Sequence, residues 1–459
     1  MKRWLYNDKS KQYLSSESEL ILPSVAGEQS EFEAIFFVGG KLVLFTTIPD
    51  EKTKCRRIYV QYLNHDGTLK NKPIKIGEAQ ESYTGKKLYS IRNAPEKQNF
   101  EIIIAPYYTI YQGELFRVKL IDYSLSEVFS KNLKLPLENR NCDVLQCRID
   151  SKKNTFFAIK AKQLSKRSSR FGKTADEFLI VAHNNALNTY KKYPIKIKKD
   201  IPYDIFFDFD RFGNIVIVGL YTQKNSRDGG FSGVFSMKIN PATQNFFKLP
   251  PKLFYKKFDR EFQNDFSLKR YGDTPEQRYS ISINDLAYIN DDEFVFVAEQ
   301  FYKTTKTIVD PMTKGESHVN YYYYNDLLYI VVRDGMINRI ERVPKSQYSI
   351  DDGGYYSSYS LLHSNYKNIK ILFNDHPANM KERELAKIKE LKNNVMKNPK
   401  GMPVMITIYE DGSFDKQPLF NEKENDGVIV KDMIVPYDDG FIIYVQEKDR
   451  YRFGTFRFY

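Results

Sequence analysis

The chain has little cysteine and little histidine. Of its 459 residues, three are cysteine (Cys55, Cys142 and Cys147) and five are histidine. The cysteines form no CxxC pair, and no group of histidines has the spacing of zinc ligands, so neither a disulfide framework nor a zinc site is expected. We therefore expect cysteines that pack as small apolar side chains, no metal site and no cofactor.

Long apolar segments are also missing. No run of about 18 apolar residues occurs, so no helix is expected to span a membrane. The first residues, MKRWLYNDKSKQYLSSESEL, contain basic residues but no apolar segment, and they do not have the pattern of a signal peptide. As written, the chain is expected in the cytoplasm, whereas a processed or incomplete N-terminus would place it in the cell envelope.

Common catalytic motifs are absent: there is no P-loop, no GxGxxG after a strand and no nucleophile elbow. Positive charge, by contrast, is in excess. Lys and Arg number 70 against 58 for Asp and Glu, which gives a net charge of +12. The 34 Tyr and 33 Phe favour strands. A basic surface favours anionic partners such as acidic glycans, nucleic acid, anionic lipid or acidic proteins.

One pattern recurs along the chain: a short strand, a turn containing Gly, Asn or Asp, and a stronger apolar strand. Examples are AIFFVGGKLVLFTT, FFDFDRFGNIVIVGLY and DLAYINDDEFVFVAEQFY. A second hairpin follows each one, and its residues alternate between apolar and polar as half-buried strands do. The repeating unit is therefore four strands. The strongest strand of each unit contains, in order, Leu42, Ile102, Phe156, Ile215, Phe294, Ile371 and Ile442.

Four-stranded units that repeat in this way are typical of β-propellers. We predict an all-β fold, a seven-bladed β-propeller of four-stranded blades in a single domain over 1–459. The last repeat lacks its final strand. The segment at about 13–23 is predicted to supply that strand and to close the ring, which removes exposed sheet edges. Two separate β domains are the alternative.

One insertion, at about 376–400, is predicted to contain a short helix over 379–397. Asn379 is placed to cap the helix, and Glu382 follows three residues later. An apolar stripe at helical spacing supports the prediction and consists of Leu385, Ile388, Leu391 and Val395.

The chain resembles the β-propeller class over nearly its whole length, although no WD, kelch or Asp-box signature recurs. SIDDGGYY is similar to a single Asp-box of sialidase-like propellers, and we interpret it as a hairpin turn. VAEQFY, YYYYNDLLYIVV, VPKSQYS, DDGGYYSSYS and LFNDH resemble a group of uncharacterised propeller-like proteins of Bacteroidota, many of them exported. This resemblance implies no activity.

In propellers, the end of the second strand of each blade and the loop after it lie on one face of the disc. The resemblance therefore implies a basic, tyrosine-rich loop face here, to which the loop from Tyr302 to Asn320 contributes Lys303, Lys306 and Lys314. Cations beside aromatic rings suit sugars, acidic glycans or single-stranded nucleic acid. A solvated lysine-rich rim is the alternative. The predicted binding residues are Lys162, Lys166, Arg167, Arg170, Tyr107, Tyr108, Tyr221, Tyr302 and Asn374.

Three polar residues, Glu299, Asp375 and His376, follow apolar strands. Glycosidases use two carboxylates across a sugar ring. Glu299 and Asp375, with His376 beside them, are therefore the candidate catalytic residues, and hydrogen-bonded strand ends are the alternative interpretation. DFDRFGN offers oxygen ligands for Ca²⁺, although an ordinary hairpin turn explains it better.

The expected function is non-enzymatic: a binding or scaffold propeller that engages an anionic glycan or protein partner, with nucleic acid less favoured. We expect a monomer or a subunit of a larger assembly, for example in the cell envelope. The alternative is a carbohydrate-active enzyme that resembles glycoside hydrolases.

Overall fold

The computed structural model divides the chain into two compact units, Met1–Leu20 with Phe254–Tyr459, and Ile21–Leu253. The expectation of a single domain over 1–459 stays a prediction. The structure describes residues 2–457 except for 8–11, 15–21, 26, 39, 65–67, 81–87, 95–98, 106–114, 137–141, 163–175, 198–199, 224–231, 243–245, 249–251, 254–279, 291, 310–311, 313–314, 365–367, 382–386, 394–400, 410–412, 421–426, 431–433, 438–439 and 448–449.

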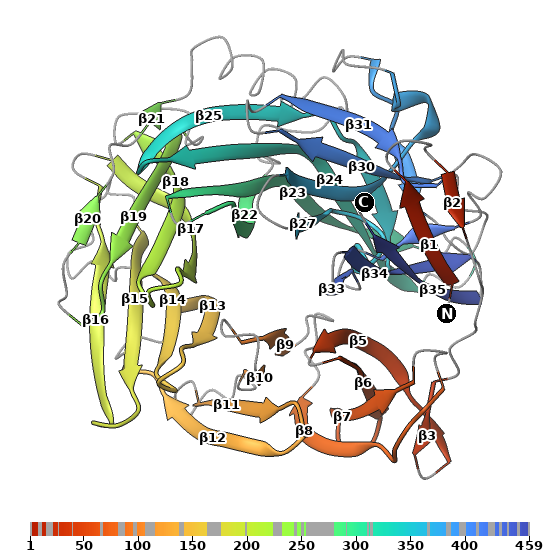
Figure 1. Ribbon diagram of the computed structural model, residues 1–459, viewed down its shortest axis with the longest axis horizontal. Coiled ribbons are helices and arrows are strands. Elements are labelled where there is room, and N and C mark those ends of the chain that lie inside the picture. The colour runs from red at the N-terminus through yellow and green to blue at the C-terminus, as the bar shows by residue number, and fades with distance from the viewer. Residues whose placement is uncertain are drawn as a thin grey trace. The chain divides into compact units, whose positions relative to one another are not determined.

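Unit Ile21–Leu253 contains four antiparallel sheets of four or more strands within its described residues, and the first four strands of each sheet are neighbours in chain order (Figure 1). Sheet 1 consists of β5 (Glu31–Val38), β6 (Lys41–Asp50), β7 (Cys55–Leu63) and β8 (Ile74–Gln80). Sheet 2 consists of β9 (Tyr89–Asn93), β10 (Asn99–Ile104), β11 (Leu115–Asp122) and β12 (Glu127–Lys134).

Sheets 3 and 4 complete the large sheets of this unit. Sheet 3 consists of β13 (Cys142–Ile149), β14 (Thr155–Lys162), β15 (Asp176–Asn184) and β16 (Thr189–Ile195). Sheet 4 consists of β17 (Asp200–Phe209), β18 (Ile215–Gln223), β19 (Gly233–Ile239), β20 (Phe246–Lys248) and β21 (Lys252–Leu253). A two-stranded hairpin, β3 (Ser24–Val25) and β4 (Glu28–Gln29), precedes them.

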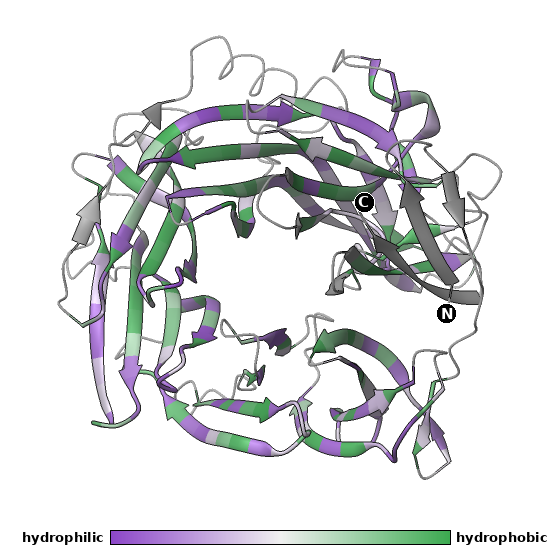
Figure 2. Cartoon of the chain, in the orientation of Figure 1, coloured by the Kyte–Doolittle hydropathy of each residue, from purple (hydrophilic) through white to green (hydrophobic). Residues whose placement is uncertain are grey.

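The core of this unit lies between consecutive sheets. Phe45 of sheet 1 packs on Phe100 of sheet 2, with 5.2 Å between ring centroids. Phe116 of sheet 2 packs on Phe157 of sheet 3 at 5.1 Å. The second strand of each sheet is buried on both faces, so its sequence is almost continuously apolar, as the green runs of Figure 2 show. This burial is why the second strands could be located from sequence alone.

The hairpin turns after the first strands of sheets 3 and 4 share one side-chain arrangement. Asp210 Oδ1 accepts a hydrogen bond from the backbone N–H of Asn214 at 2.8 Å, and Asp210 Oδ2 accepts one from Asn214 Nδ2 at 2.8 Å. Asp150 and Asn154 form the same two bonds, at 2.8 and 3.0 Å. Asp210 also pairs with Lys238. The interpretation of DFDRFGN as a hairpin turn is confirmed.

The other unit contains three large sheets within its described residues. Sheet 5 consists of β22 (Ser280–Tyr288), β23 (Glu293–Val309), β24 (Glu316–Arg333), β25 (Met336–Val343), β26 (Gln347–Ile350) and β29 (Leu391–Asn393). Sheet 6 consists of β27 (Ser360–Ser364), β28 (Asn368–Asp375), β30 (Met402–Ile408) and β31 (Phe414–Pro418). Apolar side chains of sheets 5 and 6 form one buried cluster that includes Tyr329 and Phe373.

Sheet 7 joins the two ends of the chain. It consists of β32 (Val428–Ile429), β33 (Val435–Tyr437), β34 (Gly440–Glu447), β35 (Arg450–Arg457), β1 (Lys2–Asn7) and β2 (Gln12–Leu14). β1 pairs in parallel with β35, and β2 pairs antiparallel with β1. An N-terminal strand therefore completes the last sheet, as predicted, but the strand next to β35 is β1 and not the segment at about 13–23.

The predicted helix over 379–397 is wrong for the residues that the structure describes. Pro377–Asn379 forms a short 3₁₀ helix (η1), and β29 pairs in parallel with β26. Asn379 does not cap an α-helix. Its side-chain amide bonds the backbone C=O and N–H of Lys389, each at 2.8 Å, and so fixes an extended chain. Ile388 and Leu391 are buried, so the apolar spacing reflected packing and not helical periodicity.

Candidate functional site

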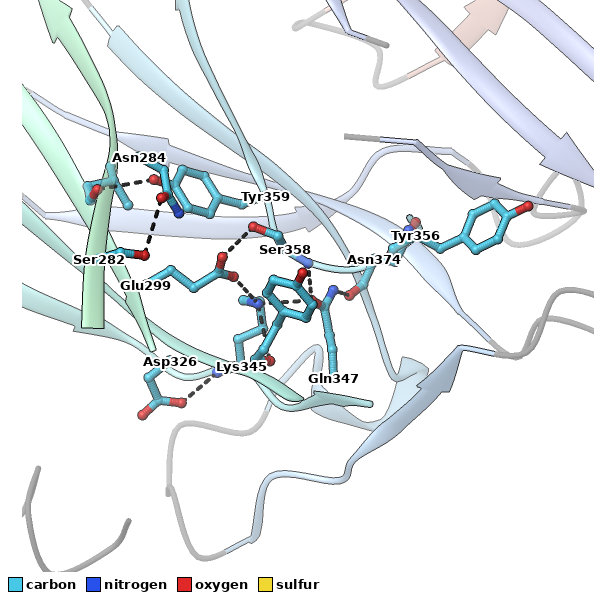
Figure 3. Close-up of polar contacts among 12 residues, drawn as sticks. Ser282, Asn284, Glu299, Asp326, Lys345, Gln347, Tyr356, Ser358, Tyr359 and Asn374 are labelled. Atoms are coloured by element: carbon cyan, nitrogen blue, oxygen red, sulfur yellow. Dashed lines mark hydrogen bonds and ion pairs between the residues drawn. The ribbon is translucent and has the colours of Figure 1, made fainter. Parts of the chain in front are cut away.

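Glu299, near the end of the apolar run of β23, lies inside the protein with only 1% of its surface exposed. Its Oε1 accepts a hydrogen bond from Lys345 Nζ at 2.7 Å, and its Oε2 accepts one from the hydroxyl of Ser358 (Figure 3). Lys345 Nζ also donates to Gln347 Oε1 at 2.9 Å and to the C=O of Tyr324 at 3.3 Å. The apolar run of β23 can end on this carboxylate because the buried charge is paired and hydrogen-bonded.

A second buried ion pair lies beside the first. Asp326 pairs with Arg342, and Asp326 Oδ1 accepts a hydrogen bond from the backbone N–H of Lys345 at 3.0 Å. Burial raises the pKa of Asp326 and lowers the pKa of Lys345. Each charge therefore depends on its partner to stay ionised in the interior.

Asp375, the second candidate catalytic carboxylate, is fully buried. Its Oδ1 accepts hydrogen bonds from the N–H of His376 at 2.7 Å and from Asn379 Nδ2 at 2.8 Å, and its Oδ2 pairs with Lys416. His376 Nδ1 accepts a hydrogen bond from the N–H of Ala378 at 3.1 Å, at the start of η1. The side chains of Asp375, His376 and Asn379 therefore hold the turn that follows β28.

Side-chain amides link the sheets of this unit. Asn374 Nδ2 donates to the C=O of Ile429 at 2.8 Å, and Asn374 Oδ1 accepts from the N–H of Ile429 at 2.9 Å, which joins sheet 6 to sheet 7. Gln347 Nε2 of sheet 5 donates to the C=O of Asn374 at 2.6 Å (Figure 3). Asn374 was predicted to bind a ligand, but it is buried and its amide is committed to the backbone.

Most of the other predicted binding residues fall outside the described part of the chain. This holds for Tyr107, Tyr108, Lys166, Arg167 and Arg170, and for the side chain of Lys162, which ends β14. The prediction that Tyr221 binds a ligand is wrong. It is only 1% exposed and belongs to the apolar cluster between sheets 3 and 4, so it offers no ring to a ligand.

Tyr302 lies on a part of sheet 5 that the sequence did not predict. The loop expected from Tyr302 to Asn320 is wrong for most of its described residues, because β23 continues to Val309 and β24 begins at Glu316. Their pairing runs without a break from Phe301 opposite Tyr324 to Val309 opposite Glu316. β26 pairs with β24 along Tyr321–Tyr324, and β29 pairs with β26.

Four half-buried tyrosines gather on one side of this extended part of sheet 5. Tyr302 stacks on Tyr323, with 5.8 Å between ring centroids and 29° between ring planes. Tyr348 lies 5.0 Å from Tyr323 and 5.9 Å from Tyr321. Alternate residues of a strand share a side of the sheet, so all four rings stand on the same side. We call Tyr302, Tyr321, Tyr323 and Tyr348 the tyrosine face.

Exposed lysines flank the tyrosine face. Lys306 Nζ lies over the ring of Tyr321, 5.3 Å from its centroid, and Lys392 of β29 is the register partner of Tyr348. Burial raises the pKa of Tyr348 to about 12, and the nearby Tyr321 and Glu390 act in the same direction. The phenol of Tyr348 therefore stays protonated and can donate a hydrogen bond at neutral pH.

The sequence contained a signal for this surface. YYYYNDLLYIVV is one of the segments that carry the resemblance, and KTTKTIV lies in the predicted loop from Tyr302 to Asn320. Thr, Ile, Val and Tyr are residues that favour strands. Reading the two segments as the arms of one long hairpin would have placed Tyr302 opposite Tyr323.

Neither a metal centre nor a membrane helix stands out in the described residues. They contain no group of three or more His, Cys, Asp or Glu side chains arranged to hold a metal ion. Among the same residues, no helix is long and apolar enough to cross a membrane.

No family model and no curated protein matches the chain. Similar solved structures include an ulvan lyase of polysaccharide lyase family PL25, at 10% identity and a TM-score of 0.43, covering 96% of this chain and 94% of that chain. The β-propeller domain of the Trilobed protease from Pyrococcus furiosus covers 92% of this chain and 93% of its own, at 9% identity and a TM-score of 0.41. A thermostable family-43 glycoside hydrolase covers 72% and 98%, at 10% identity and a TM-score of 0.32. The chain is all-β, with the repeated four-stranded antiparallel sheets from which β-propellers are built.

Proposed function

We propose that this protein is a non-enzymatic binding propeller, which holds an anionic polymer against the tyrosine face and its flanking lysines. The observation that carries the proposal is the arrangement on sheet 5, where lysines border a row of half-buried tyrosines. Aromatic rings provide contact area and the lysines provide attraction for negative charge. We also propose that the chain is related to the uncharacterised propeller-like proteins of Bacteroidota that it resembles, and this relation implies no activity.

The local balance of charge supports an anionic ligand. Lys306, Lys389 and Lys392 are all exposed on or beside the extended part of sheet 5. Carboxylates also lie near this face: the charge of Glu390 acts on Tyr348, and Asp351 accepts hydrogen bonds from Asn320, the residue before Tyr321. The three exposed ammonium groups attract a polyanion, whereas a neutral polymer gains nothing from their charge.

The geometry does not favour the alternative, a carbohydrate-active enzyme that uses Glu299 and Asp375. Both carboxylates are buried, and each forms an ion pair with a lysine, Lys345 or Lys416. A glycosidase acid or nucleophile must reach the glycosidic bond. These two side chains instead stabilise the fold, so we propose no catalytic role for them.

The double substitution Lys306→Gln and Lys392→Gln should weaken the binding of a polyanion about tenfold. Each exposed ion pair is worth about 0.5–1 kcal/mol, and about 1.4 kcal/mol corresponds to a factor of ten. The measurement is the dissociation constant of the full chain for chondroitin sulfate at low and moderate salt. Binding by the unmodified protein should also weaken as salt rises.

Lys303→Gln is the matched control. Lys303 Nζ lies over Tyr322 at 5.1 Å, almost the geometry of Lys306 over Tyr321, but on the opposite side of the same two strands. Lys303→Gln should leave the affinity within about twofold, as expected for an exposed charge that touches no ligand. If Lys303→Gln weakened binding as much as the double substitution, general surface charge, and not the tyrosine face, would be what attracts the polymer.

A further inference from the structure

A diagonal row of four side chains crosses the extended part of sheet 5 on the side of the tyrosine face. It runs Lys306, Tyr321, Tyr348, Lys392, with one residue from each of β23, β24, β26 and β29. Lys306 contacts the Tyr321 ring, the rings of Tyr321 and Tyr348 lie 5.9 Å apart, and Tyr348 is in register with Lys392. Two phenols therefore lie between two lysine residues.

The rings of this row present their hydroxyl ends more than their faces. The ring of Tyr321 is contacted by Lys306 and Tyr348, and the ring of Tyr348 by Tyr321 and Tyr323. Side chains on a sheet stand roughly perpendicular to it, so the phenol oxygens of stacked rings point away from the backbone. A nucleic-acid base needs an open ring face on which to stack. This row instead suits a ligand with oxygen acceptors.

From this geometry we infer that the ligand is an acidic polysaccharide, whose sulfate or carboxylate groups are held by the hydroxyls of Tyr321 and Tyr348 between Lys306 and Lys392. The inference rests on the proposed function and names its ligand class. A phenol donates to an anionic oxygen and also accepts from a sugar hydroxyl. Along the row, two hydroxyls lie between two positive charges. This order matches a polysaccharide in which sugar hydroxyls separate the anionic groups better than it matches an acidic peptide in which amides separate the carboxylates.

The decisive variant is Tyr321→Phe with Tyr348→Phe, which keeps both stacked rings and removes only the two hydroxyls. Its affinity for chondroitin sulfate should fall about tenfold or more, because hydrogen bonds to charged groups are the stronger class. Tyr322→Phe is the matched control. Tyr322 is the next residue of β24 and lies under Lys303 on the opposite side of the sheet. Removal of the Tyr322 hydroxyl should therefore leave the affinity unchanged.

The probes are chondroitin sulfate, alginate, neutral dextran, poly-dT and polyglutamate, each titrated into the full chain, with the thermal midpoint of every variant measured as a test of folding. Binding of chondroitin sulfate or alginate with loss in the double Phe variant supports the inference, and the preferred polymer tells sulfate from carboxylate. Unchanged affinity in that variant, or tighter binding of poly-dT or polyglutamate, overturns the inference while the proposed function stands. Failure of all four polyanions to bind overturns both.

Discussion

Replacing Lys345 with Met should lower the free energy of unfolding by about 3–5 kcal/mol, the cost of leaving one partner of a buried ion pair without its counter-charge. Glu299 would keep the Ser358 hydroxyl but lose the ammonium group 2.7 Å from its Oε1. Gln347 Oε1 and the C=O of Tyr324 would lose the same donor. The effect should appear in urea denaturation of the full chain as a lower midpoint with little change in slope.

The double variant Glu299→Gln with Lys345→Met separates the charge from the packing. With both charges removed, much of the lost stability should return, because a neutral amide is far less costly to bury than an unpaired carboxylate. Lys303→Met is the surface control and should cost less than about 0.5 kcal/mol. If Lys345→Met alone costs no more than this control, the pair does not stabilise the fold as argued. Glu299→Gln should leave polymer binding unchanged, whereas an enzyme that relied on Glu299 would still bind but lose turnover.

Stability should also depend on the protonation of Glu101, a buried carboxyl in the other unit. Glu101 on β10 accepts a hydrogen bond from the N–H of Ile149 on β13 and lies 3.2 Å from Arg148 Nε. Burial raises the pKa of Glu101 from 4.5 to about 7, against the opposing effects of Arg148 and the Ile149 N–H. Charges of Arg92 and Asp208 also act on it.

The sign of the pH dependence follows from this raised pKa. Between pH 4.5 and about 7, the folded protein holds this proton more tightly than the unfolded chain does. The stabilising contribution is therefore complete below pH 4.5 and is lost as the pH rises through 7. The shift corresponds to about 3 kcal/mol at 1.36 kcal/mol per pKa unit.

Denaturation of the unmodified protein and of Glu101→Gln at several pH values from 4 to about 8 measures this contribution. Gln keeps an acceptor for the Ile149 N–H but does not titrate, so the difference in stability between the two proteins should change by about 3 kcal/mol across the range. Burial lowers the pKa of His183, so the contribution of this residue to stability is lost as the pH falls. That contribution is the same in both proteins and cancels in the difference between them. A difference that is constant with pH would contradict the raised pKa of Glu101.

The sequence predicted the strands that are buried on both faces and failed where burial is one-sided. Phe156 lies in a run that is continuously apolar because sheets 2 and 4 pack on the two faces of its strand. The extended part of sheet 5 combines KTTKT on β23 with four consecutive tyrosines on β24, and neither segment shows the apolar–polar alternation of a half-buried strand. In the insertion, the bonds between Asn379 and Lys389 outweigh local helix propensity.

The site was less predictable than the fold for a similar reason. Glu299 could be selected because it ends an apolar run, but its partner Lys345 stands 46 residues further along the chain with no local spacing to connect them. Tyr302 was predicted as a binding residue. Tyr321 and Tyr348, its companions on the tyrosine face, come from strands whose pairing depends on a long hairpin, and the sequence pattern there predicts a loop.

A zero-length carbodiimide crosslink between the full chain and a chondroitin sulfate tetrasaccharide, mapped by mass spectrometry, tests the central claim most directly. The reagent joins a ligand carboxylate to an ammonium group that it contacts. The account predicts crosslinks at Lys306 and Lys392, which flank the tyrosine face, and few at Lys303 on the opposite side of the same strands. Crosslinks at Lys303 as frequent as at Lys306, or crosslinks confined to other parts of the chain, would contradict it.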